Sequence, residues 1–131
     1  MPLTVDELLE RARRELVRVE PQQAAIELAG GAMLVDMRPV EQRQADGCIP
    51  GATVINRNVL EWRLAPESPW RIPAATSCDI RVIVVCNQGF SSSLAAATLK
   101  ELGLVNATDM IGGFQAWLAA GLPTTPFEDH A

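Results

Sequence analysis

The residues with the clearest chemical potential lie at the end of an apolar, β-branched stretch, where Cys86 is followed by a short glycine-containing loop and a helix-forming segment. This order predicts a thiol at the start of a helix. The N–H groups of a first helical turn lack intrahelical partners and form the positive end of the helix dipole, so they favour a thiolate. We therefore expect Cys86 to be a nucleophile. The substrate-binding loop that would surround its sulfur as a cradle for anions consists of Asn87, Gln88, Gly89, Phe90, Ser91 and Ser92.

A plainer interpretation of Cys86 stands beside this one. Taken out of context, a cysteine at the end of an apolar strand is usually a core residue, because unpaired cysteine is among the most buried residue types. The loop after Cys86 and the motifs elsewhere in the chain favour the nucleophile.

Strand and helix patterns alternate along the chain. Thr4 and Glu7 have the spacing of a capping box, which predicts a helix from there to about Leu16. Further helices are expected at 21–28, 40–45, 58–64, 91–102 and 114–120, and strands at 32–36, 53–56, 81–86 and 107–111; at 16–19 a short first strand competes with helix. Strands separated by helices predict an α/β fold with a central parallel sheet of about five strands and helices on both faces.

Four segments follow the expected strand ends, at 36–38, 56–58, 86–91 and 111–113. The functional crevice of an open parallel sheet lies beyond the carboxyl ends of its strands, so these segments are expected to share one rim. On this rim we interpret Asp36 and Arg38 as a structural ion pair rather than as catalysts. Gly112 and Gly113 are expected to permit unusual backbone angles or a close approach.

Composition narrows the range of functions. With 131 residues, 48% of them hydrophobic, residues 1–131 are expected to form a single domain with an ordinary core. A net charge of -5 argues against partners such as nucleic acid or an anionic membrane, which require clustered Lys and Arg. The first twenty residues are charged throughout and no apolar run is long enough to span a bilayer, so we expect a cytoplasmic protein.

The cysteines and the histidine do not form a metal-binding pattern. Cys48, Cys78 and Cys86 are irregularly spaced without a C-x-x-C motif, and the single histidine is His130. This arrangement fits neither a disulfide framework nor a zinc site.

Several motifs occur together in the order and approximate spacing of a rhodanese domain. They are Asp36-Met37-Arg38, Gly47-Cys48-Ile49-Pro50-Gly51-Ala52, the strand-Cys86-loop-helix unit, Gly112-Gly113-Phe114-Gln115-Ala116-Trp117 and Ala120-Gly121-Leu122-Pro123. The chain thus resembles the single-domain rhodanese-like sulfurtransferases over residues 31–123, with 1–19 as an added N-terminal helix and 124–131 as a tail. The resemblance implies the three-layer rhodanese-like fold.

The resemblance also implies a sulfur relay that needs no metal or organic cofactor. A donor such as thiosulfate or a persulfide would pass its outer sulfur to Cys86, and the resulting persulfide would give it to cyanide or to a thiol acceptor, including a protein thiol.

The Cys86 loop departs from the family pattern in its charge. In active relatives the cysteine is commonly followed by Arg or Lys inside the loop, with another Arg at the position of Ser91, whereas this loop is uncharged. A neutral contact is roughly half as strong as a charge-assisted one, which leaves room for a persulfide or a less charged donor. We expect Arg57 and Arg63, near the rim, to supply the missing charge from outside the loop.

Two other functions are alternatives at this point. A cysteine-based phosphatase uses a similar strand-loop-helix unit, but it needs an Arg at the far end of the loop to hold the phosphate oxygens, and no Arg follows Cys86. A non-catalytic rhodanese-like module that binds or senses a partner through the same rim is favoured by the neutral loop and disfavoured by the retained thiol.

Overall fold

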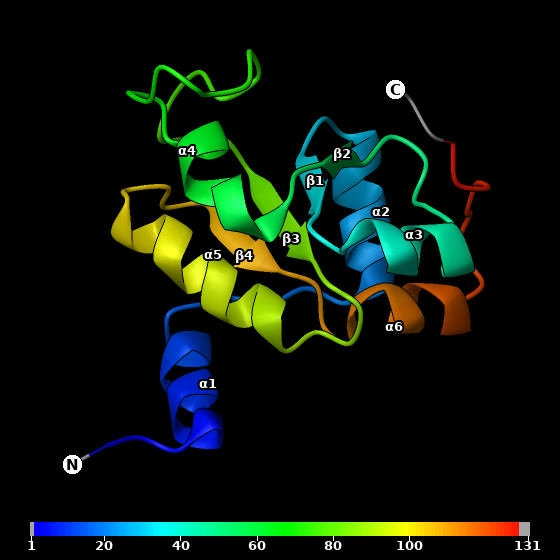
Figure 1. Cartoon of the computed structure of the whole chain (residues 1–131), viewed down its shortest axis with the longest axis horizontal. Helices are drawn as coiled ribbons and strands as arrows, with labels where there is room; N and C mark the ends of the chain where they lie inside the picture. Colours follow the sequence, from blue (N-terminus) through cyan, green and yellow to red (C-terminus); the bar gives the residue numbers. More distant parts are fainter. Residues whose placement is uncertain (1, 129–131) are drawn as a thin grey trace.

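The strands of the protein form one parallel sheet with the order β2-β1-β3-β4 (Figure 1). The computed structural model describes residues 2–128, so Met1 and the last three residues of the predicted tail, 129–131, which include His130, lie outside it. The strands are β1 (Met33–Asp36), β2 (Thr53–Val54), β3 (Val82–Val85) and β4 (Ala107–Asp109). β1 and β3 pair in parallel over their whole length, with Asp36 opposite Val85. The two central strands therefore end side by side, and the segments that follow them share one edge, as predicted.

Helices cover both faces of this sheet. They are α1 (Val5–Arg14), α2 (Pro21–Ala29), α3 (Val40–Asp46), the 3₁₀-helix η1 (Arg57–Val59), α4 (Leu60–Leu64), α5 (Ser91–Glu101) and α6 (Gly113–Ala119). Figure 1 shows α4 and α5 on one side of the sheet and α2, α3 and α6 on the other. Each face of the sheet has its own core cluster. Val82 and Val84 of β3 belong to the cluster that includes residues of α4 and α5, and Ile83 and Val85 belong to the cluster that includes residues of α2 and α6. Successive residues of a strand point to opposite faces. The predicted three-layer α/β arrangement is confirmed. No helix within residues 2–128 is both long enough and apolar enough to cross a membrane.

The strand that competes with helix at 16–19 is reduced to a single parallel bridge between Val19 and Met110, next to β4. The Leu16 N–H still donates to the Arg13 carbonyl oxygen at the end of α1, and Pro21, which has no N–H, begins α2. Within this segment Val19 carries the ladder bonds: its N–H donates to the Asp109 carbonyl oxygen, and its carbonyl oxygen accepts the Ile111 N–H. The sheet within the described part of the chain thus has four strands and one bridge, where about five strands were expected.

The N-terminal helix begins as the sequence predicts. The Thr4 hydroxyl oxygen accepts the Glu7 N–H at 3.1 Å, and the Glu7 carboxylate accepts the Thr4 N–H at 3.0 Å. α1 projects away from the sheet below α5 (Figure 1), and Val5 near its start is 74% exposed while Ala12 near its end is buried. The fold therefore holds α1 by its C-terminal end.

Candidate active site

Cys86 lies directly between β3 and the loop that leads into α5. Its Sγ accepts hydrogen bonds from the backbone N–H groups of Gly89, at 3.1 Å, and Ser92, at 3.4 Å. The residue is 6% exposed, so most of its surface is covered by the loop and the core. The loop thus presents N–H groups to the sulfur, as the helix-start arrangement predicts.

The environment of Cys86 lowers the pKa of its thiol below the ordinary value. Burial raises this pKa, but hydrogen bonds from Ser92, Ser91 and the Gly89 N–H outweigh the effect of burial. The Ser92 hydroxyl also lies 2.7 Å from a carboxylate oxygen of Asp109, which competes for its one proton, so the bonds from the two backbone N–H groups are the ones that no other acceptor shares. Hydrogen bonds to the charged form of a group favour that form, and the thiolate is the reactive form of cysteine.

The start of α6 fixes the backbone around Cys86 from the opposite side. The Phe114 N–H donates to the Cys86 carbonyl oxygen at 2.9 Å, and the Gln115 N–H donates to the Asn87 carbonyl oxygen at 3.1 Å. This approach requires Gly113, since a Cβ at that position would lie 2.5 Å from the Cys86 carbonyl oxygen. Gly112, with a φ of 74°, allows the turn that comes directly before α6. The close approach expected for the two glycines is therefore present.

The other loop residues divide into two groups. The Asn87 side-chain oxygen accepts a hydrogen bond from the Gln115 amide at 3.0 Å, and Ser92 is buried. Gln88, Phe90 and Ser91 are exposed beside the buried sulfur. The loop therefore combines a backbone turned toward Sγ with side chains available to a substrate.

Asp36 and Arg38 form the expected ion pair at the rim. Arg38 Nη2 lies 2.8 Å from Asp36 Oδ2, and both side chains are almost fully buried. The Arg38 guanidinium also lies over the Phe114 ring, 3.7 Å from its centroid, and donates to the Gly47 carbonyl oxygen. The pair thereby joins the end of β1 to α6, the helix that fixes the Cys86 backbone.

Arg57 and Arg63 have partners away from the Cys86 loop. Arg57 forms an ion pair with Glu61 at 2.9 Å, and Arg63 donates to the Trp70 carbonyl oxygen at 2.7 Å. These contacts hold both side chains on η1 and α4. That Arg57 and Arg63 supply positive charge to an anionic donor stays a prediction.

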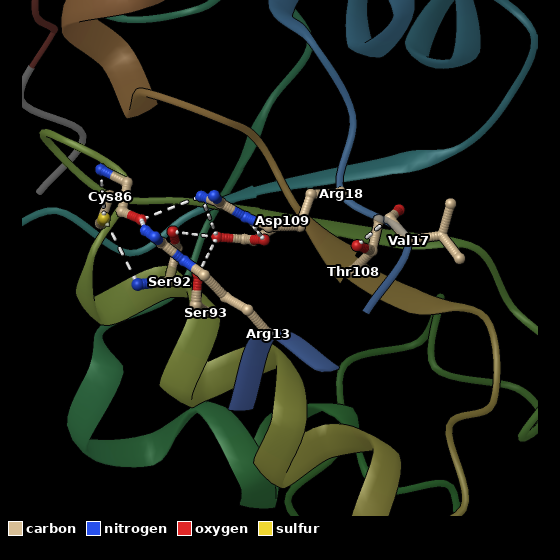
Figure 2. A network of polar contacts seen from close by, with 9 residues as sticks. Arg13, Val17, Arg18, Cys86, Ser92, Ser93, Thr108 and Asp109 are labelled. Atoms are coloured by element: carbon tan, nitrogen blue, oxygen red, sulfur yellow. Dashed lines mark hydrogen bonds and ion pairs between the residues drawn. The ribbon is translucent and has the colours of Figure 1, made fainter. Parts of the chain in front are cut away.

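The cations that do contact the loop come from the N-terminal segment (Figure 2). The Gly89 carbonyl oxygen accepts hydrogen bonds from Arg13 Nη2 at 2.8 Å and from Arg18 Nη2 at 3.0 Å. Arg18 Nε also forms a 2.8 Å ion pair with the buried carboxylate of Asp109 at the end of β4. Sequence reasoning missed these three residues. The one available signal was an uncharged loop in a chain with four arginines among its first eighteen residues.

Asp109 also binds the first turn of α5. Its Oδ2 accepts hydrogen bonds from the hydroxyl groups of Ser92, at 2.7 Å, and Ser93, at 2.8 Å. Arg13 Nε donates to the Ser93 hydroxyl oxygen at 3.1 Å. One buried carboxylate thus connects the N-terminal segment, β4 and the start of α5.

Comparisons with known proteins agree with this geometry. A family model described as Rhodanese-like domain matches residues 20–120. Curated relatives include the thiosulfate sulfurtransferase GlpE of Pseudomonas entomophila, 36% identical over 79% of this chain and 85% of the relative, and that of Haemophilus influenzae, 35% identical over 80% and 90%.

Solved structures also resemble the chain. A Rhodopseudomonas palustris protein of unknown function, described as a possible tyrosine phosphatase, superposes with a TM-score of 0.84 at 31% identity, covering 95% of this chain and 99% of the other. The polysulfide-sulfur transferase homodimer of Wolinella succinogenes gives a TM-score of 0.73 at 25% identity, with coverage of 94% and 88%.

Proposed function

Because the chain belongs to the rhodanese-like domain family, we propose that it is a sulfurtransferase in which Cys86 carries the transferred sulfur as a persulfide. The observation that carries this proposal is the Cys86 sulfur, which accepts two backbone N–H hydrogen bonds and has a lowered pKa. Nucleophilic catalysis of this kind divides the transfer into two easier displacements.

The first displacement loads the enzyme. The Cys86 thiolate attacks the outer sulfur of the donor, a bond forms between Sγ and that sulfur, and the donor's S–S bond breaks. With thiosulfate, sulfite leaves with the electron pair. The N–H groups of Gly89 and Ser92 hold the negative charge near Sγ before the attack and on the persulfide after it.

The second displacement unloads it. Cyanide or a thiolate attacks the terminal sulfur of the persulfide, the Sγ–S bond breaks, and the Cys86 thiolate is restored. Thiocyanate or an acceptor persulfide is the product. We propose a thiol, including a protein thiol, as the acceptor. We also propose that the protein works in the cytoplasm, the location that its composition favours.

Uptake of sulfur by Cys86 tests the function. We expect the reduced chain, incubated with thiosulfate or a small persulfide, to gain the mass of one sulfur atom and to lose it when cyanide is added. The Cys86→Ser variant should gain nothing, whereas Cys78→Ser, which removes an exposed thiol, should behave like the unchanged chain. No gain with either donor would contradict sulfur transfer.

That negative result would favour the second candidate, a non-catalytic binding or sensing module. The 6% exposure of Cys86 and its uncharged loop are the observations that support this alternative. A phosphatase is disfavoured because Arg13 and Arg18 bind the Gly89 carbonyl oxygen, whereas phosphate binding requires guanidinium donors directed at the anion.

The contribution of Arg57 and Arg63 is tested with the donor. If they bind an anionic donor, the double alanine variant should take up sulfur from thiosulfate about fivefold more slowly, since two exposed charge contacts of about 0.5 kcal/mol each are lost. Arg71→Ala removes an exposed arginine from the loop after α4 and is the matched control. Equal rates in the three proteins would remove Arg57 and Arg63 from the donor site.

A further inference from the structure

Both backbone polar groups of Gly89 contact charged or reactive groups. Its N–H donates to Cys86 Sγ, and its carbonyl oxygen accepts hydrogen bonds from the guanidinium groups of Arg13 and Arg18. Its backbone has a φ of 84°, a conformation that only glycine adopts readily, and a Cβ there would lie 2.7 Å from the Gly112 nitrogen. The orientation of Gly89 therefore decides whether its own N–H, the shorter of the two described bonds to the sulfur, is made.

We propose that Arg13 and Arg18, anchored by Asp109, are positioning residues that hold the Cys86 loop in its sulfur-binding conformation. That this positioning serves sulfur transfer rests on the proposed function, whereas the contacts of the two arginines with the loop are independent of it. Both arginines precede the segment 20–120 that matches the family model. The N-terminal segment is thus part of the active site rather than an appendage to it.

The anchoring of Arg18 supports this assignment. The Arg18 side chain is 15% exposed and the Asp109 side chain has no exposed surface. The Arg18 guanidinium binds both carboxylate oxygens of Asp109, and its Nη2 also donates to the Gly89 carbonyl oxygen. A planar guanidinium fixed by two bonds to a carboxylate has few alternative orientations. Arg18 therefore transmits the position of β4 to the loop.

Arg13 adds a second support from the end of α1. It donates to the Gly89 carbonyl oxygen and the Ser93 hydroxyl oxygen, and its guanidinium lies 5.8 Å from the centroid of the Phe90 ring. A single helical residue thus contacts the loop and the first turn of α5. These contacts explain why the fold holds α1 by its C-terminal end.

The charges around the loop favour a thiolate. Arg13 and Arg18 carry two positive charges against the single negative charge of Asp109, so one negative charge on Cys86 makes the cluster neutral. Four other acidic side chains lie near the loop or its two arginines. Glu10 pairs with Arg14, Asp36 pairs with Arg38, Asp46 accepts a hydrogen bond from the Gln115 amide, and Asp6 lines the same surface pocket as Arg13 and Phe90. The two arginines therefore supply the positive charge that the loop sequence lacks.

The test is the pH dependence of Cys86 alkylation by iodoacetamide in the full chain. Peptide mass spectrometry must follow Cys86 alone, because Cys78 is exposed and Cys48 is half-buried. The folded-state pKa is lowered, so the rate should stay high below the ordinary thiol pKa of about 8.5 and fall only as the pH drops through the folded-state value. In Arg13→Gln we expect this midpoint to rise by about half a unit or more.

Arg14→Gln is the matched control, because Arg14 is the next residue, is exposed and pairs only with Glu10 among its described contacts. It should shift the midpoint far less, since exposed charges are screened. Arg18→Lys keeps a charge for Asp109 but loses the second donor for Gly89, so its midpoint should also rise. Thermal melts confirm that each variant is folded.

Equal midpoints in Arg13→Gln and Arg14→Gln, or an unchanged midpoint in Arg18→Lys, would overturn the proposal. A protein that takes up no sulfur but shows the expected midpoints would contradict the proposed function and leave the positioning role intact.

Discussion

Gly113→Ala is expected to destabilise the protein by about 2–4 kcal/mol and to abolish most sulfur uptake by Cys86. The new Cβ would lie 2.5 Å from the Cys86 carbonyl oxygen and 2.7 Å from the Asn87 carbonyl carbon. Both are backbone atoms, so no side chain can move aside. The φ of 62° at this position adds strain. Relief of the contact must move either α6 or the loop, and the loop holds the N–H donors to Sγ.

Gly121→Ala separates these two effects. This glycine also has a positive φ, 71°, but a Cβ there would meet nothing within 4 Å. Its substitution should cost only about 1–2 kcal/mol of backbone strain and leave sulfur uptake unchanged. Urea unfolding and the mass gain with thiosulfate give both quantities. Equal losses of stability and activity in the two variants would show that α6 does not position the loop.

Asp109→Asn is expected to have the second largest effect. Asp109 has no exposed surface and accepts hydrogen bonds from Arg18, Ser92 and Ser93. Removal of its charge leaves Arg18 without its ion-pair partner. Breaking a fully buried pair costs about 3–5 kcal/mol; because Arg18 keeps 15% exposure, we expect a somewhat smaller loss of about 2–4 kcal/mol. Sulfur uptake should fall because the turn of α5 loses its anchor.

The control for this prediction is Glu10→Gln, which breaks the Glu10–Arg14 pair. Both partners are about two thirds exposed, 68% and 67%, so the variant should lose no more than about 0.5 kcal/mol. Chemical denaturation compares the two changes directly. If Asp109→Asn unfolds at the same urea concentration as Glu10→Gln, the buried network does not stabilise the fold.

Local sequence predicted the parts of the site that neighbouring residues determine. The capping box of Thr4 and Glu7, the ion pair of Asp36 and Arg38, and the passage from strand to Cys86 to helix each involve residues within six positions of one another. Such contacts follow from the conformation of one turn or one strand end. The alternation of strands and helices likewise predicted the parallel sheet with covered faces.

Local sequence also predicted a short strand at 16–19 that the structure largely lacks. Leu16 to Val19 has the pattern of a short strand, but the Leu16 N–H bonds to the end of α1, the Val17 carbonyl oxygen accepts the Thr108 hydroxyl, and only Val19 bridges to Met110. Tertiary contacts, rather than residue type, decided the outcome.

Only the tertiary structure decided which charges serve the nucleophile. Arg13 and Arg18 reach Gly89 across 76 and 71 residues, and Arg18 reaches Asp109 across 91, after the sheet order has placed β4 next to β3. Arg57 and Arg63, which come after a strand, are the cations that the sequence suggested, yet their described partners lie elsewhere. The sequence by itself determined the position of the reactive sulfur and the loop around it, because the backbone N–H groups at a helix start are a local property. The pairing of charges that are distant in sequence depends on tertiary packing, which the periodicity of apolar residues does not encode.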